Sequence, residues 1–389
     1  MSNSKRNMIL IILSSFISEL ADYIFDIGII IYLYKSTKST ALISGVFISQ
    51  LLPAFLILVI GRTIDIFDKK KLIILCKACR IILFFVLLVN RSTITIYIVS
   101  FLLSFILEYS SNIINALMTD LFTKEELLNK SSIISTANSV SMIAGPLLAS
   151  VLTYKTSLNV TISINIVLCM VVTVLYCGLK VERTLYSDGL TGIGERYKKR
   201  NIVKAILQNR QVVCTIIFWS IFMFIIGLMG PLEIVMIEKV IHAPSDFYGI
   251  GNSVEGIGML VASAALIGIS KKMSPNRAVA FGLILSSIAY LVIGVSPDLY
   301  VYLIGAFFVG AAAALCPLGF KTAVQTYSDK NIIGRTFAIS RFVVIIVRLI
   351  GVSVSGWIVL KCGIRRLYMF AAIVMILSAV TFLMRREKR

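Results

Sequence analysis

The chain has 389 residues, of which 58% are hydrophobic and only 15% are charged, and its mean hydropathy is +0.94. A water-soluble core cannot bury so much apolar surface, so this composition excludes an ordinary soluble protein. The formal net charge of +19 is typical of some nucleic-acid-binding proteins. Here, however, the basic residues are spread through short loops between apolar runs, where the anionic inner leaflet of a membrane is the simpler partner.

Apolar runs long enough to cross a membrane recur along the whole chain. A helix needs about 20 residues to span roughly 30 Å of hydrocarbon, and a window of that length finds about twelve candidates. They lie approximately at residues 8–34, 41–60, 72–89, 94–117, 133–154, 161–179, 212–236, 248–269, 278–295, 300–320, 336–360 and 366–384. The sequence therefore predicts an all-α membrane protein with twelve transmembrane helices.

The distribution of basic residues predicts the orientation. With the N-terminus in the cytoplasm, about 26 of the 38 Lys and Arg lie in loops and tails on the cytoplasmic side. We therefore expect both termini to be cytoplasmic and the protein to lie in the plasma membrane. The first apolar run follows Lys5 and Arg6 but contains acids and no small-residue cleavage site, which predicts a retained helix.

The second half of the chain repeats the first. A shift of about 205 residues superposes residues 127–131 on residues 332–336. This repeat predicts two pseudo-symmetric six-helix bundles, at residues 1–179 and 212–389. Residues 180–211 form the longest polar stretch, which we interpret as a cytoplasmic linker that ends in an amphipathic helix.

The turn between the second and third apolar runs, residues 61–71, resembles a known signature. Gly61, Asp65, Lys69 and Lys70 match the positions of the loop between helices 2 and 3 in the major facilitator superfamily. Other positions of that loop depart from the family pattern, namely Thr63, Ile64, Ile66 and Asp68. The resemblance implies the major facilitator fold and transport by alternating access around a cavity at the bilayer midplane.

Further segments are similar to one branch of that superfamily, the macrolide-efflux and siderophore exporters. The segment that begins with Gly145 and Pro146 in helix 5 resembles an exporter element in which small residues and a proline allow bending and close approach of a neighbour. Gln325 and residues 334–337 before helix 11, and residues 119–127 after helix 4, resemble the same branch. Helix 4, however, lacks the arginine that many drug antiporters carry there.

Three carboxylates occupy one face of the first helix. Glu19, Asp22 and Asp26 are spaced by three and four residues, and the first two lie roughly 17 to 21 Å into the helix. Clustered carboxylates in a poorly hydrated site repel one another, so at least one should exchange a proton near neutral pH. Alternatively, Asp26 meets the outer water and Glu19 bonds a neighbouring helix.

Other charged residues also lie within predicted spans. Arg348 lies about 18 Å into helix 11, where an unpaired guanidinium would be unfavourable. It should therefore pair with an acid across the cavity, and the helix 1 carboxylates are the leading candidates. The alternative is a static ion pair without a role in transport. Glu108 and Asn112 in helix 4 either line the inner half of the cavity or satisfy helix contacts. Lys77 and Arg80 lie early in helix 3, where we expect their side chains to reach the cytoplasmic interface.

The signature loop predicts a gate on the cytoplasmic side. Asp65 is expected to accept hydrogen bonds from Lys69 or Lys70 and from the start of helix 11 at Gly334 and Arg335. We also assign Gly61, Gly145 and Pro146 to gating, as residues that allow a helix to bend or a neighbouring helix to approach closely. The simpler alternative is a turn held together by ordinary surface charges.

The candidate chemistry of the chain excludes several classes of protein. The sequence has one histidine, His242, and one C-x-x-C pair, Cys76 and Cys79, with no second pair. This pattern predicts neither a metal site nor an enzyme. We therefore predict a monomeric secondary transporter without a cofactor, which uses the proton gradient to export an amphipathic drug-like or natural-product molecule. Its partners are that small molecule, protons and membrane lipids, without nucleic acid. Uptake, lysophospholipid transport and a non-transporting receptor are the alternatives.

Overall fold

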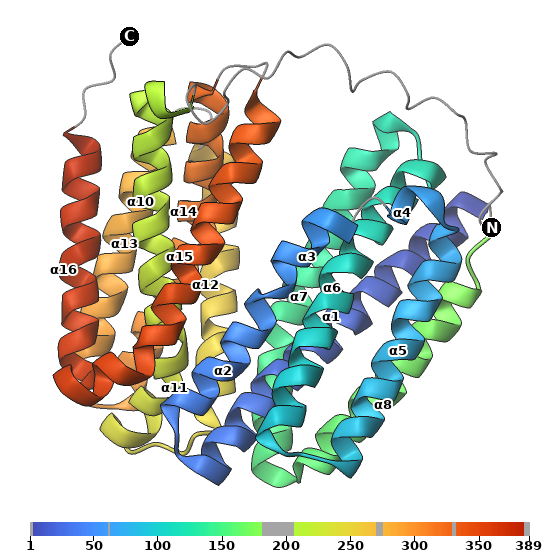
Figure 1. Ribbon diagram of the computed structural model, residues 1–389, viewed down its shortest axis with the longest axis horizontal. Helices are drawn as coiled ribbons and strands as arrows, with labels where there is room; N and C mark the ends of the chain where they lie inside the picture. Colours follow the sequence, from blue (N-terminus) through green and yellow to red (C-terminus); the bar gives the residue numbers. More distant parts are fainter. Residues whose placement is uncertain (1–2, 61–62, 181–205, 270–274, 329–331, 385–389) are drawn as a thin grey trace. The chain divides into compact units, whose positions relative to one another are not determined.

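The computed structural model describes residues 3–60, 63–180, 206–269, 275–328 and 332–384 (Figure 1). These residues form helices joined by short connections and contain no β-strand. The helices are α1 (Asn3–Thr37), α2 (Thr40–Leu51), α3 (Pro53–Ile60), α4 (Thr63–Ile66), α5 (Lys69–Val89), α6 (Thr93–Leu121), α7 (Lys124–Lys155), α8 (Leu158–Cys177), α10 (Arg210–Met229), η1 (Gly230–Leu232), α11 (Glu233–Val235), η2 (Met236–Val240), α12 (Phe247–Ile269), α13 (Pro275–Val295), α14 (Leu299–Tyr327), α15 (Ile333–Cys362) and α16 (Ile364–Leu383).

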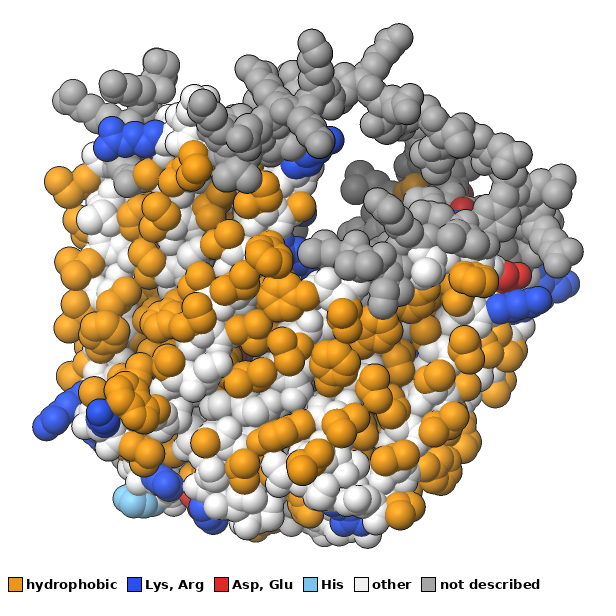
Figure 2. Space-filling view, viewed as in Figure 1, with side chains coloured by type: hydrophobic (Ala, Val, Ile, Leu, Met, Phe, Trp, Pro, Cys, Tyr) orange, Lys and Arg blue, Asp and Glu red, His pale blue; other side chains and the backbone are white. Residues whose placement is uncertain are grey.

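The helices confirm the expected all-helical membrane architecture. In the described part of the chain, ten helical segments are long and apolar enough to cross a membrane. The broken pair α2 and α3, together with α12, occupies the two remaining predicted spans. Hydrophobic side chains cover much of the visible sides of the helices (Figure 2), as expected for surfaces that contact lipid.

Local sequence explains where the helices end or bend. Most helices extend past the predicted spans because hydropathy detects only their apolar part, whereas capping residues continue the helix into polar ends. Asp68 accepts a hydrogen bond from Lys71 N at 3.1 Å at the start of α5, and Asp298 does the same for α14. Pro53 lacks an N–H group, and the predicted span 41–60 is accordingly divided into α2 and α3 at this point.

The chain forms two compact units. Unit 1 contains Met1–Glu182 and Pro231–Gly256, and unit 2 contains Arg183–Gly230 and Ile257–Arg389. In unit 1, α1 packs against α7 and α8, and α5 packs against α6 and α8. In unit 2, α13 packs between α14 and α16, and α10 packs along α15. The domain boundaries predicted from the sequence remain a prediction, because residues 181–205 of the expected linker lie outside the described residues.

Candidate functional site

The three carboxylates of α1 are half-buried inside unit 1, and each meets a different helix. Glu19 Oε1 accepts a hydrogen bond from Asn138 Nδ2 of α7 at 3.4 Å. Asp22 Oδ1 accepts from Arg80 Nη2 of α5. Asp26 Oδ1 accepts from Gln50 Nε2 of α2 at 2.9 Å. The weak contact of Glu19 leaves that carboxylate the least restrained. The shared face predicted for the three acids is therefore bonded to α2, α5 and α7.

Two basic residues of α5 complete this cluster, contrary to the sequence-based expectation. Arg80 is 1% exposed and forms an ion pair with Asp22, and Lys77 is 2% exposed and donates to Ser18 Oγ at 2.7 Å. Neither side chain reaches the interface. The physical reason is that the facing helix α1 offers a carboxylate to Arg80 and a hydroxyl group to Lys77, which offset the loss of water around the two cations. The sequence did contain a signal for the burial of Arg80, because this residue lies about 16 Å along α5 from Lys69, well away from the start of the helix.

We call the side chains Glu19, Asp22, Asp26, Lys77 and Arg80 the charge cluster. With every member ionised, three negative and two positive charges leave a net charge of −1, so one bound proton would neutralise it. Hydrogen bonding inside the cluster is incomplete, because Asp22 Oδ2 and Arg80 Nε and Nη1 are buried without a partner. Such a set responds strongly to one added or removed charge, because the surrounding medium screens charges weakly.

The other polar candidates of unit 1 lie on α6. Glu108 and Asn112 are half-buried and four residues apart, so they share one face of that helix. Their predicted role in lining a cavity is not tested by these positions.

The predicted gating loop is described in part. Gly61 lies outside the described residues, and the structure describes the backbone of Asp65 in α4 but not its side chain. Lys69 Nζ donates to Asp120 Oδ2 of α6 at 2.6 Å, and Lys70 Nζ donates to the backbone oxygens of Cys177 and Leu179 at 2.8 and 2.7 Å. The two lysines thus join the start of α5 to the end of α6 through a carboxylate and to the end of α8 through backbone carbonyl groups, which attract cations at a helix C-terminus.

A capping box orders the neighbouring start of α7. The backbone N–H of Thr123 donates to Glu126 Oε2 at 3.3 Å, and Lys130 Nζ donates to Glu126 Oε1 at 2.9 Å. The hydrogen bond from Lys130, together with the contacts to Thr123, holds the pKa of the exposed Glu126 carboxyl below its ordinary value.

The exporter-like element on α7 is a point of close helix approach. A Cβ atom at Gly145 would overlap Tyr23 of α1, and a Cβ atom at Gly249 of α12 would overlap the backbone oxygen of Pro146. One turn further along α7, Ser150 Oγ donates to the backbone oxygen of Asp246. The small residues and the proline therefore bring α1 and the start of α12 against α7 in unit 1.

Ion pairs join the end of α1 to the segment Pro231–Gly256. Lys35 Nζ lies 2.8 Å from Asp246 Oδ1, and Lys38 pairs with Glu238. Lys38 and His242 have φ values of 52° and 60°, a left-handed conformation that is unfavourable for residues other than glycine. Both strained residues lie in the connections that carry these ion pairs, so the contacts help to hold the connections in place.

In unit 2, the structure places the remaining predicted residues on α15. Gly334 and Arg335 are exposed at the start of this helix, and a Cβ atom at Gly334 would meet no other atom within 4 Å. Arg348 is half-buried near the middle of α15, and Gly227 of α10 lies against its backbone oxygen. None of the ion pairs formed by the described residues includes Arg348. Its pairing with an α1 carboxylate remains a prediction.

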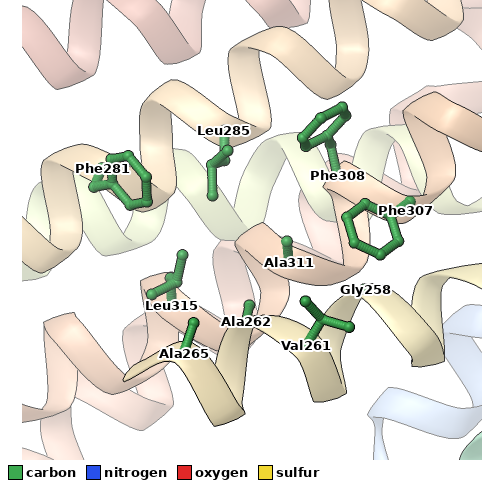
Figure 3. A pocket seen from close by; sticks show the side chains of 10 residues that line it. All are labelled: Gly258, Val261, Ala262, Ala265, Phe281, Leu285, Phe307, Phe308, Ala311 and Leu315. Atoms are coloured by element: carbon green, nitrogen blue, oxygen red, sulfur yellow. The ribbon is translucent and has the colours of Figure 1, made fainter. Parts of the chain in front are cut away.

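An apolar cavity of about 180 Å³ lies among α12, α13 and α14 of unit 2 (Figure 3). The largest side chains around it are Val261, Phe281, Leu285, Phe307, Phe308 and Leu315. The lining has no charged or hydrogen-bonding side chain that could orient a polar ligand. None of the candidate residues predicted from the sequence contributes to it.

Comparisons with known proteins agree with this architecture. The model of the Major Facilitator Superfamily matches residues 11–238 and 228–389, which together cover almost the whole chain. No curated protein matches the chain in sequence.

Solved structures with a similar fold include proteins named as transporters. The nucleoside transporter NupG has a TM-score of 0.79 at 14% identity, covering 98% of both chains. The peptide transporter POT in complex with sulfate has a TM-score of 0.73 at 9% identity, covering 97% of this chain and 94% of the other. A bacterial homologue of the human lysosomal transporter Spinster, in an inward-facing and unoccupied conformation, has a TM-score of 0.69 at 12% identity, covering 98% of this chain and 96% of the other.

Proposed function

Because the chain belongs to the Major Facilitator Superfamily and is therefore a multi-pass membrane transporter, we propose that it is a proton-coupled exporter of an amphipathic drug-like or natural-product molecule. The observation that carries the proposal is the charge cluster of unit 1. In this proposal the protein lies in the plasma membrane with both termini in the cytoplasm, and it works as a monomer.

The charge cluster supports proton coupling because its charge balance is one proton away from neutrality. Asp22 is held by Arg80, whereas Glu19 makes only the 3.4 Å contact with Asn138. Glu19 and Asp26 are therefore the proposed proton acceptors, and Asp22 with Arg80 and Lys77 sets the local electrostatic potential. Proton binding would weaken the attraction between α1 and α5 and so favour a rearrangement of unit 1.

Alternating access requires contacts to break on one side of the membrane at a time. We propose that the outer contacts are Lys35 with Asp246 and Lys38 with Glu238. The proposed cytoplasmic gate is formed by Gly61, Asp65, Lys69 and Lys70 together with Gly334 and Arg335. Gly145 and Pro146 let α7 adapt to both arrangements, while Glu108, Asn112 and Arg348 are proposed to contact the substrate.

Three segments resemble macrolide-efflux and siderophore exporters and therefore favour export. They are the Gly145 and Pro146 element, the segment with Gly334 and Arg335, and the loop after α6. Uptake and lysophospholipid transport use the same fold and remain the alternative outcomes of the test. The identities of 9–14% with NupG, POT and Spinster indicate a shared fold alone.

The test is transport by the purified protein in proteoliposomes with an imposed proton gradient. The panel contains macrolides, cationic dyes, siderophores and lysophospholipids. We expect movement of at least one amphipathic compound, driven by the gradient and opposite to the proton flow. Movement in the same direction as the protons would indicate uptake, and flux that ignores the gradient for every compound would refute proton coupling.

A matched pair of variants assigns the coupling to the cluster. Glu19→Gln should retain substrate exchange but lose its dependence on the gradient, because the neutral amide cannot carry the proton. Glu126→Gln changes a carboxylate outside the cluster, at the exposed start of α7, and should retain gradient-driven transport.

A further inference from the structure

The apolar cavity of unit 2 lies where α12 and α14 contribute short side chains to a common lining (Figure 3). A Cβ atom at Gly258 would overlap the backbone oxygen of Phe307, so the two helices touch at that point. Further along, the lining residues of the two helices include three alanines, Ala262, Ala265 and Ala311. Their side chains are too short to fill the space between the helices, and a cavity of about 180 Å³ remains.

The mouth of the cavity lies on the exposed face of α13. Phe281 lines the cavity and is 49% exposed, and Val261 of α12 is 52% exposed. From residue 278 to the end of α13, the exposed side chains are all apolar, namely Phe281, Ile288, Leu291 and Val295. Their spacing of seven, three and four residues places them on one face of the helix. An exposed apolar face of a membrane-crossing helix contacts lipid, so the cavity opens toward the hydrocarbon of the bilayer.

The depth of the cavity corresponds to the chains of the lipids and not to their headgroups. Phe281 and Leu285 lie about 9 and 15 Å from the start of α13, whereas headgroups lie at the ends of a membrane-crossing helix. The lining has no charged or hydrogen-bonding side chain, and an apolar cavity of this kind does not hold water. An empty cavity would leave its lining atoms without van der Waals partners. A hydrocarbon chain supplies those partners without burying a polar group.

We propose that this cavity binds one acyl chain of a membrane phospholipid, which enters from the bilayer between Phe281 and Val261. The bound chain packs between α12 and the pair α13 and α14, and so fills the gap that the alanines leave. This lipid site goes beyond the proposed transport function, because it involves neither the charge cluster of unit 1 nor a proton.

The test detects an acyl chain in the cavity by fluorescence quenching. Bromine atoms quench tryptophan on contact, so the probe is a phosphatidylcholine with dibromostearoyl chains, whose bromine atoms lie near mid-chain. The protein is held in micelles of a steroid-based detergent, because a rigid ring system is too wide to replace a linear chain in a cavity of about 180 Å³. The added phospholipid then supplies the chain.

Two single-tryptophan proteins provide the matched comparison. The two native tryptophans, Trp219 and Trp357, are changed to phenylalanine. The reporter is Phe281→Trp at the mouth of the cavity, and the control is Phe370→Trp on α16, which does not line the cavity. The two positions are 49% and 52% exposed, and each is the seventh residue of its helix, so both meet the micelle at a similar depth.

The proposal predicts a difference between these two proteins. At a low share of brominated lipid, we expect about two- to fivefold stronger quenching in Phe281→Trp than in Phe370→Trp, because a chain in the cavity stays beside the indole. Unbrominated phosphatidylcholine should remove this excess by competition. Equal quenching at the two positions would overturn the proposal, as expected of a cavity that stays empty or receives a different apolar molecule. Weaker quenching in Phe281→Trp would also overturn it, as expected where a second copy of the chain covers this face.

Filling the cavity locates the effect. In the Phe281→Trp protein, Ala262→Leu should abolish the excess quenching, because the larger side chain occupies the space of the acyl chain. Ala264→Leu, at an exposed position of α12 outside the lining, should leave the excess unchanged. Excess quenching that persists in Ala262→Leu would place the lipid outside the cavity and refute the proposal. Where Ala262→Leu does not fold, the comparison of the two reporter positions decides the question. Binding in micelles needs no proton gradient, so a negative result here would leave the proposed transport function standing.

Discussion

Arg80 contributes to two kinds of contact between the helices of unit 1. It is buried, it neutralises Asp22, and its guanidinium lies 5.9 Å from the ring centroid of Phe84. Phe84 in turn packs edge-to-face on Phe25 of α1 with centroids 5.2 Å apart. One arginine therefore links an electrostatic contact and an aromatic contact between α1 and α5, so its removal should affect both stability and coupling.

The first prediction concerns the ion pair of Arg80 and Asp22. Arg80→Gln should lower the free energy of unfolding by about 3–5 kcal/mol, because it leaves a buried carboxylate without its cation. Asp22→Asn in the same protein should recover part of the loss, with an interaction energy of about 1–3 kcal/mol. A double-mutant cycle on thermal unfolding in detergent measures this energy. Strict additivity would show that the contact contributes nothing to stability.

The second prediction separates Glu19 from the structural members of the cluster. Because its contact with Asn138 is long, Glu19→Gln should change the free energy of unfolding by less than about 1 kcal/mol, since only a weak hydrogen bond is altered. Asn138→Ala is the matched test of the same contact from α7. A loss in Glu19→Gln as large as that in Arg80→Gln would make Glu19 a structural residue and not a proton carrier.

At the scale of the helices, close packing depends on a few glycines. Gly145 on α7, Gly227 on α10 and Gly249 on α12 each lie against atoms of a neighbouring helix that a Cβ would overlap. The overlapped atoms at Gly227 and Gly249 are backbone oxygens, which cannot rotate away as a side chain can. The crossings at Gly227 and Gly249 should therefore tolerate substitution poorly.

The third prediction compares a glycine that packs against a neighbouring helix, Gly227 of α10, with one that meets no neighbour, Gly334 of α15. Gly227→Ala should destabilise unit 2 by about 1–3 kcal/mol, because α10 and α15 must separate to make room. Gly334→Ala, at the start of α15, meets no atom within 4 Å and should change stability by no more than about 0.5 kcal/mol in the unfavourable direction. Thermal unfolding of both variants provides the comparison, and similar losses for the two would contradict the packing account.

At the scale of the whole molecule, the ends of α1 are tied to segments that are distant in sequence. Asn7 Nδ2 donates to Lys180 O at 2.8 Å near the beginning of α1. Near its end, Lys35 and Lys38 pair with Asp246 and Glu238. The latter pairs lie within unit 1 and add to the contacts that join Pro231–Gly256 to α7. A transport cycle with alternating access would have to break and remake such contacts.

The fourth prediction tests the pair of Lys35 and Asp246. Lys35→Asp should expose the buried Ser150, which bonds the backbone of Asp246 and is 3% exposed. Labelling of Ser150→Cys by a membrane-impermeant maleimide measures this exposure in a protein whose exposed Cys177 and Cys362 are changed to serine. We expect a labelling rate about two- to fivefold higher, as for a partly exposed ion pair of about 0.5–1 kcal/mol.

The charge-swapped variant is the control for that experiment. Lys35→Asp combined with Asp246→Lys restores opposite charges and should bring the labelling rate back toward that of the parent. Equal rates in the parent, the single variant and the swapped variant would show that the ion pair does not hold the segment in place.

The amino-acid sequence was sufficient for the membrane architecture. The twelve apolar runs predicted from hydropathy match the helices within a few residues, apart from the longer polar ends. Each such run must be helical because a helix satisfies its own backbone hydrogen bonds in lipid. The spacing of Glu19, Asp22 and Asp26 likewise placed them on one face of α1, since that depends on helix geometry alone.

The partners of those residues depended on tertiary structure. Lys77 and Arg80 read as interfacial cations in a linear sequence, because their positions near the start of α5 do not reveal which helix they face. Packing of α5 beside α1 brings Arg80 to Asp22, and packing of α7 and α2 brings Asn138 to Glu19 and Gln50 to Asp26. A local pattern determines whether a segment crosses the membrane, whereas the charge that stabilises a buried carboxylate comes from a residue distant in sequence and is decided by how the helices pack.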